Sequence, residues 1–137
     1  MADFVVHTDG GARGNPGPAA IGVVIDWPNG TSDKKHRAIG ETTNNQAEYR
    51  AVLWAWHLLA GHTQPEDKIT FYLDSELVVK QLKGEYRVKD PGLAVLYRQV
   101  KQEEEQPVAS CDYRHIKREE NVEADAEVNL ALDALAK

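Results

Sequence analysis

The order of strand-like and helix-like segments constrains the fold of this chain more than any other feature. Residues 3–11 are predicted as a strand that ends at Asp9 and runs into a turn at the paired glycines Gly10 and Gly11, and two more strands follow within 19–41, on either side of the turn Pro28-Asn29-Gly30. Beyond them the chain alternates: a helix over 42–62, a strand over 67–75, helices over 76–84 and from 90 onward, a strand over 108–117 and a helix over 121–137. This order predicts an α/β protein with a five-stranded mixed sheet flanked by helices.

Length and composition limit the classes of protein that remain. With 137 residues we expect a single domain, 1–137, which works as a monomer. No apolar run is long enough for a membrane span, a strand begins near Phe4 without room for a signal peptide, and Cys111 is the only cysteine. These features predict a cytoplasmic protein without disulfides or membrane partners. The net charge of −6 argues mildly against nucleic acid as a partner, although only the charge of the binding face decides this.

Four acidic residues occupy comparable places in this predicted fold. Asp9 and Asp74 come at the ends of predicted strands, whereas Glu48 and Asp125 fall in the first turns of predicted helices. Strand ends and helix starts of an α/β sheet meet at one edge, so the four carboxylates are expected to converge. Their mutual repulsion would be offset by two divalent cations, Mg²⁺ or Mn²⁺, about 4 Å apart, which can activate water and stabilise a leaving oxygen of a phosphodiester.

Each acid also has an ordinary structural explanation. Acids near helix starts are commonly surface residues that interact with the helix dipole, and an aspartate after a strand is commonly a turn residue. Position alone therefore leaves both interpretations open, and local motifs must decide between them.

Four motifs identify a known family. The segments TDGGARGNPGPAAIG (8–22), TTNNQAEYRAV (42–52), LDSELVVKQL (73–82) and REENVEADAEVN (118–129) resemble type 1 ribonuclease H in order and spacing, and the resemblance extends over the whole chain. It implies the ribonuclease H fold and Mg²⁺-dependent endonucleolytic hydrolysis of the RNA strand in RNA–DNA hybrids. It further implies that Asp9 and Asp74 bridge two metal ions, that Glu48 also senses the ribose 2′-hydroxyl, and that Asp125 is the fourth ligand.

The same resemblance implies a set of substrate-binding residues. Glycines beside the first acid allow close approach of the hybrid's minor groove, polar side chains contact that groove, and a threonine holds a phosphate of the DNA strand. The residues are Gly10, Gly11, Asn15, Thr43, Asn44 and Asn45. Without the resemblance, Asn15 and Asn44 would be interpreted as turn or capping residues.

The chain departs from many bacterial relatives in the segment KGEYRVKDPG (83–92), which is too short for their basic protrusion. Four basic residues, Lys80, Lys83, Arg87 and Lys89, still gather around it. Tyr86 could stack on the DNA strand or pack on its own helix. Glu76 stands where many relatives have a glutamine that contacts the minor groove. Because a carboxylate donates no hydrogen bond, this contact would change, and the choice between the hybrid and double-stranded RNA as substrate stays open.

The region before the last helix departs as well. Relatives place a histidine in a flexible loop there, which helps the product leave, whereas His115 is expected inside a strand. Lys117 or Arg118 are therefore candidates for this role.

Elsewhere, one of Trp54 and Trp56 is expected in the core and the other as a cover over it. Three leucines of the last helix are expected to pack, Leu130, Leu132 and Leu135. Two alternatives remain: a metal nuclease of the same fold with a broader substrate range, and a hybrid-binding module without catalysis.

Overall fold

The computed structural model describes residues 1–136 and confirms the predicted mixed sheet of five strands in the order β3-β2-β1-β4-β5. The strand β2 pairs antiparallel with both β1 and β3. On the other side of β1, β1 pairs parallel with β4, and β4 pairs parallel with β5. The strands are β1 (Asp3–Ala12), β2 (Gly17–Asp26), β3 (Ser32–Thr42), β4 (Lys68–Leu73) and β5 (Ser110–His115). The helices are α1 (Asn44–Leu59), α2 (Glu76–Leu82), α3 (Pro91–Glu103) and α4 (Val122–Leu135), and a short 3₁₀ helix, η1 (Arg118–Glu120), precedes α4.

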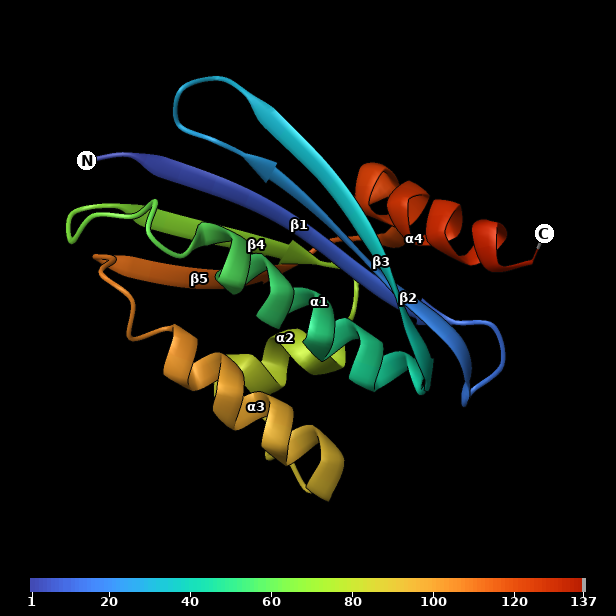
Figure 1. Cartoon of the computed structure of the whole chain (residues 1–137). Coiled ribbons are helices and arrows are strands. Elements are labelled where there is room, and N and C mark those ends of the chain that lie inside the picture. The colour runs from blue at the N-terminus through green and yellow to red at the C-terminus, as the bar shows by residue number, and fades with distance from the viewer. Residues whose placement is uncertain (137) are drawn as a thin grey trace.

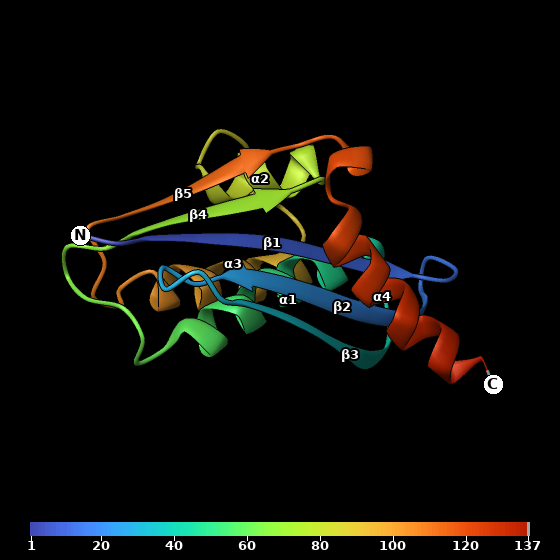
Figure 2. The ribbon, with the colours of Figure 1, turned by 90° about the horizontal axis from the view of Figure 1, so that it is seen from above.

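The helices form two layers around the sheet. Figures 1 and 2 show α1, α2 and α3 on one face and α4 alone on the other, where it crosses β1, β2 and β3. Consecutive residues of β1 face these two layers in turn. A Cβ added to Gly10 would lie 2.3 Å from the backbone carbon of Ala47 in α1, and one added to Gly11 would lie 3.7 Å from Val128 in α4. Gly10 therefore lets α1 approach the sheet closely enough to bring its side chains beside β1.

The core lies between the sheet and α1. Trp56 is fully buried in it, packs against Phe71 with the two rings tilted by 39°, and donates a hydrogen bond to the hydroxyl of Tyr113 at 3.1 Å. Trp54 is half-buried and covers the outer edge beside β3, so the expectation of one core tryptophan and one cover is confirmed. The expectation for the leucines of α4 is wrong in part: Leu132 is buried, but Leu130 and Leu135 are each 54% exposed because α4 contacts the sheet along only one side.

Two sequence-based placements need correction. Asp9 does not end β1, because the strand continues to Ala12 through pairing of Gly10 and Gly11 with β2. Glu48 lies in the second turn of α1 and not the first, because the helix begins at Asn44, capped by the Thr43 hydroxyl that accepts the Gln46 amide hydrogen at 3.2 Å. Neither shift changes the sheet edge at which the two acids lie.

Candidate active site

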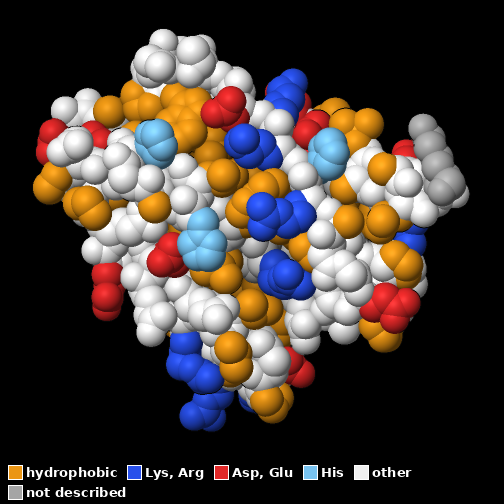
Figure 3. All heavy atoms as spheres, in the orientation of Figure 1, with side chains coloured by type: hydrophobic (Ala, Val, Ile, Leu, Met, Phe, Trp, Pro, Cys, Tyr) orange, Lys and Arg blue, Asp and Glu red, His pale blue; other side chains and the backbone are white. Residues whose placement is uncertain are grey.

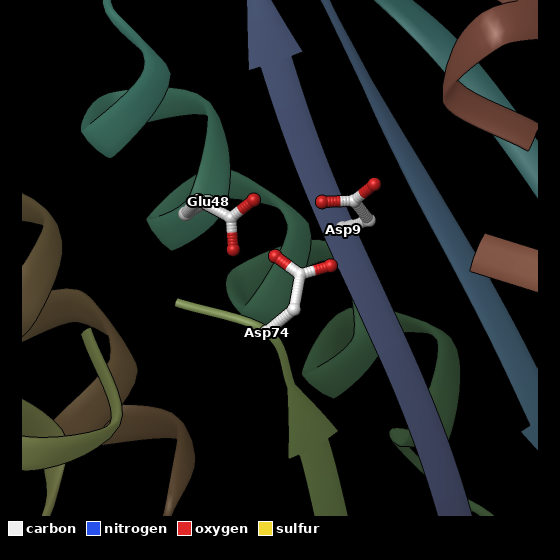
Figure 4. A group of neighbouring side chains, drawn as sticks. All are labelled: Asp9, Glu48 and Asp74. Atoms are coloured by element: carbon white, nitrogen blue, oxygen red, sulfur yellow. The ribbon is translucent and has the colours of Figure 1, made fainter. Parts of the chain in front are cut away.

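Three of the four acidic residues form a compact cluster. Asp9 comes from β1, Glu48 from α1 and Asp74 from the residue that follows β4, and each offers a carboxylate oxygen within 4.8 Å of the others. Figure 4 shows the three carboxylates pointing toward one another. The cluster forms because β1 and β4 are parallel neighbours and because α1 packs on β1 over Gly10.

Asp125 lies in the same pocket but at its open side. All four acids line one cavity of about 420 Å³, in which Asp125 comes from the first turn of α4. Its side chain is 32% exposed, accepts a hydrogen bond from Asn129 at 3.3 Å and lies 3.8 Å from the guanidinium of Arg118. Asp125 therefore faces the cluster without belonging to its closest group.

The environment of the cluster opposes negative charge. Burial is the main cause that raises the pKa of Asp9 to about 7; a hydrogen bond with Glu48 lowers the pKa, and the charges of Asp74 and Asp125 raise it. Burial, followed by the charge of Asp9, raises the pKa of Glu48 well above its usual range. In the absence of a cation, Asp9 and Glu48 thus hold a proton that isolated carboxyl groups would have lost.

The donors around the cluster leave one buried oxygen without a partner. The Gly10 amide donates to Asp9 Oδ1 at 2.9 Å and to Glu48 Oε1 at 2.8 Å. Glu48 Oε2 is buried and has no hydrogen-bond partner within the described chain. An unpaired buried oxygen among converging carboxylates is costly unless a cation binds there, and oxygen ligands suit hard divalent ions. The residues present therefore fit a divalent-cation site.

One residue that holds this cluster in place was not singled out by the sequence. Asn121, directly before α4, is 1% exposed and donates from Nδ2 to the Thr8 carbonyl at 2.9 Å and to Asp74 Oδ2 at 3.1 Å. Its own carbonyl accepts the first helical hydrogen bond, from the Asp125 amide at 3.1 Å. Asn121 thus connects the segments that carry Asp9, Asp74 and Asp125. Only its position four residues before Asp125 could have indicated this.

The residues expected to bind substrate fall into two groups. Gly10, Gly11, Asn44 and Asn45 line the carboxylate pocket. Asn15 and Asn44 brace the neighbouring loop, because Asn15 Oδ1 accepts from the Asn44 amide at 2.9 Å and Asn44 Oδ1 accepts from the Ala12 amide at 2.8 Å. Thr43 is the cap of α1, as described above.

Glu76 and Tyr86 lie outside this lining. Glu76 pairs with Lys80 at 3.3 Å and lies 3.8 Å from His115, which belongs to β5 as expected. Tyr86 is 47% exposed beneath the ammonium group of Lys80 and lines a separate groove between the α2–α3 connection and α3. These two residues therefore form part of a neighbouring surface and not of the carboxylate pocket.

Comparison with known proteins agrees with the fold and the site. A family model described as reverse transcriptase-like matches residues 7–131. A bifunctional protein of Mycobacterium tuberculosis is 38% identical over 141 residues, which are 96% of this chain but 36% of that protein. Ribonuclease HI of Halobacterium salinarum is 40% identical over 131 residues, which are 93% of this chain and 63% of that protein. The chain thus spans only part of the length of both relatives.

A solved structure matches this chain over nearly the full length of both chains. LC11-RNase H1 in complex with an RNA/DNA hybrid is 39% identical, superposes with a TM-score of 0.91 and covers 98% of this chain and 99% of its own. The fold and the carboxylate pocket together define the ribonuclease H-like class of α/β proteins. The chain belongs to the reverse transcriptase-like family, as a compact type 1 ribonuclease H.

Asn121 supplies a test of how the pocket is held. Replacing Asn121 by alanine is expected to weaken Mg²⁺ affinity by roughly 10- to 100-fold, the range found for partners of metal ligands, because Asp74 loses its donor. Titration calorimetry measures this change, and urea denaturation reports the accompanying loss of stability. Asn29→Ala, which removes an asparagine contact in the turn between β2 and β3 outside the pocket, is the matched variant. Equal Mg²⁺ affinity in the wild type and Asn121→Ala would show that Asn121 is merely structural.

Proposed function

We propose that this protein hydrolyses the RNA strand of RNA–DNA hybrids at internal positions, with two Mg²⁺ ions as cofactors and Mn²⁺ as a substitute. The main evidence for the proposal is that the carboxylates of Asp9, Glu48 and Asp74 converge, and that Glu48 Oε2 is buried among them without a hydrogen-bond partner. The hybrid bound to the related LC11-RNase H1 supports the substrate class.

The chain's own residues have distinct tasks in this proposal. Asp9, Glu48 and Asp74 would hold the divalent ions, with Asp125 as a ligand from the exposed side. The chemistry that a divalent pair supplies when bound is activation of water and stabilisation of the departing oxygen. The Gly10 amide, shared between Asp9 and Glu48, fixes the direction of both carboxylates. A fixed arrangement lowers the reorganisation needed when charge develops on the phosphate.

Recognition of the RNA strand is proposed to take place beside the cluster. Asn45 is exposed in the pocket lining and can exchange hydrogen bonds with a 2′-hydroxyl and a base edge in the minor groove. Gly10 and Gly11 let the strand approach the backbone. Asn15 and Thr43 are proposed to act next to them, with Asn15 holding Asn44 in place.

The surface around Tyr86 is proposed to receive the DNA strand. Its exposed ring, with Arg87 and Arg98 in the same groove, provides a stacking face and cations. Glu76 lies next to the pocket residue Ser75 and donates no hydrogen bond, which leaves double-stranded RNA as a second candidate substrate.

A substrate comparison tests the proposed function. The protein is incubated with Mg²⁺ and labelled RNA–DNA hybrid, double-stranded RNA and double-stranded DNA. Cleavage of the hybrid within its RNA strand supports the proposal, and additional cleavage of double-stranded RNA supports the broader range. Cleavage of DNA, or hybrid binding without cleavage, would overturn it. The single-domain assignment of residues 1–137, the monomeric state and the cytoplasmic location stay predictions.

Arg118 is proposed to assist release of the cleaved strand in place of a loop histidine. Its guanidinium is 81% exposed and lies 3.8 Å from Asp125 at the open side of the pocket, where it can compete for a phosphate. Arg118→Ala is expected to lower steady-state kcat about tenfold, as removal of one stabilising contact does, while a single-turnover rate changes less. Lys117→Ala is the neighbouring control. An equal fall in both rates would assign Arg118 to the chemical step instead.

A further inference from the structure

A row of cations crosses the face formed by α1 and β3. Figure 3 shows Lys and Arg side chains gathered in a row over the middle of this face. The α1–β3 basic row consists of Lys35 and Arg37 from β3 and Arg50 from α1. Arg37 lies over the ring of Trp54 with its guanidinium carbon 4.6 Å from the centroid, and Arg50 donates to the Ile39 carbonyl at 3.3 Å. These contacts hold both guanidinium groups in fixed positions.

The basic row is not neutralised by the chain's own acids. On the other side of β3, Lys34 pairs with Glu123 at 2.9 Å and His36 with Glu127 at 3.1 Å. Because side chains alternate along a strand, Lys35 and Arg37 face away from α4. Within residues 1–136, no carboxylate lies within 4 Å of a charged nitrogen of Lys35, Arg37 or Arg50.

Other charged groups on β3 flank the basic row. Asp33 accepts a hydrogen bond from the Trp27 indole at 2.7 Å, and Glu41 lies near the other end of the strand. The three cations thus keep their positive charge without an ion pair in a chain whose net charge is −6. Since this overall charge repels a polyanion, binding must depend on local surfaces of this kind.

The basic row begins about 1.4 turns of α1 from the carboxylate pocket. Asn44 and Asn45 of α1 line that pocket, and Arg50 follows Asn45 by five residues, which is about 7.5 Å along the helix axis and about 140° around it. Arg50 therefore points to a different side of α1 than Asn45.

The pocket repels phosphate until divalent cations bind, because its lining carries four acids, and its two arginines lie beside acids, Arg13 beside Asp133 and Arg118 beside Asp125. Affinity for a nucleic acid must therefore come from cations beside the pocket.

We propose that the α1–β3 basic row is a second nucleic-acid contact, which holds the phosphate backbone of a substrate that extends beyond the carboxylate pocket. Guanidinium groups bind phosphate through paired hydrogen bonds, and the fixed positions of Arg37 and Arg50 reduce the entropy lost on binding. The proposal rests on the proposed function, because it assumes that nucleic acid occupies the pocket.

The test compares two substrates and three variants. One substrate is a short hybrid that spans only the pocket, and the other is the same hybrid extended by single-stranded DNA at both ends. Binding is measured by fluorescence anisotropy over a series of salt concentrations, with Ca²⁺ in place of Mg²⁺, and kcat is measured in Mg²⁺. The variants are Lys35→Gln/Arg37→Gln/Arg50→Gln, the single change Lys35→Gln, which leaves the Trp54 and Ile39 contacts intact, and the control Lys34→Gln.

For the extended substrate, the triple variant is expected to bind roughly tenfold more weakly. The slope of log K against log salt concentration should become less steep by about 2 to 3, since each lost phosphate contact reduces this slope by about 0.7 to 0.9. Lys35→Gln is expected to show about a third of this change in salt dependence. The short hybrid and kcat should not change, and Lys34→Gln should behave as the wild type. Equal weakening for both substrates, or no weakening for the extended one, overturns the proposal. If the wild type fails to cleave even the short hybrid, the proposed function itself fails.

Discussion

Replacing Asp74 by asparagine is expected to reduce hybrid cleavage by on the order of 10³-fold or more, with the fold intact. The amide keeps the shape of the carboxylate but loses its charge and one acceptor oxygen. Asn121 donates to Asp74 Oδ2 at 3.1 Å, so the new amide oxygen will turn toward Asn121 and its NH₂ group toward Asp9 and Glu48. A donor in that place opposes a cation, whereas hybrid binding, which depends on surfaces around the pocket, is retained.

Single-turnover hydrolysis of labelled hybrid measures this loss, and thermal denaturation checks the fold. Asp112→Asn is the matched control, because Asp112 is a β5 residue that pairs with Arg114 at 2.9 Å outside the pocket. Cleavage by Asp74→Asn within tenfold of the wild-type rate would show that the cluster is not the reaction site.

The second large effect is expected in the stability of the metal-free protein. The pKa of Asp9 is raised from 3.8 to about 7. Between these values the native state binds a proton that the unfolded chain has lost, so the free energy of unfolding falls as the pH rises from about 4 to 7. At about 1.4 kcal/mol per pH unit, a shift of this size corresponds to a loss on the order of 4 kcal/mol, to which Asp9 and its neighbour Glu48 contribute together. The loss is complete above pH 7, where both states have released the proton.

Urea denaturation in the presence of EDTA at several pH values tests this expectation. Asp9→Asn removes the charge, so its stability should depend less on pH and should exceed that of the metal-free wild type above pH 7. The exposed Asp3→Asn is the control and should follow the wild type. Added Mg²⁺ should restore wild-type stability but not that of Asp9→Asn, because a ligand stabilises only the state that binds it. A wild-type stability that does not fall over this range would contradict the expected repulsion.

The sequence predicted the parts of the fold that depend on local signals. The turn at Pro28-Asn29-Gly30 follows from side chains that favour that backbone conformation, and the order of strands and helices followed from their spacing. The resemblance in four motifs identified the acids that line the pocket. Boundaries were less accurate where tertiary pairing decides them, as in β1, which extends beyond Asp9 despite two glycines because β2 pairs with it.

Features that depend on packing between distant segments were not predictable. Apart from its position four residues before Asp125, Asn121 gave no signal in the sequence, since its side-chain partners Thr8 and Asp74 lie far away along the chain. Leu130 and Leu135 are apolar but exposed, because the narrow contact of α4 with the sheet is a property of the whole fold. β3 consists almost entirely of polar residues, and only the structure separates the cations that pair with α4 from those that face outward.

The most direct test of the account is the location of Mn²⁺, a cation with oxygen ligands like those of Mg²⁺, in crystals of the wild-type protein. Anomalous scattering is expected to place Mn²⁺ among the carboxylates of Asp9, Glu48 and Asp74, with Asp125 beside it, and to show none there in crystals of Asp9→Asn. Mn²⁺ bound elsewhere while these carboxylates remain without a cation would contradict the account.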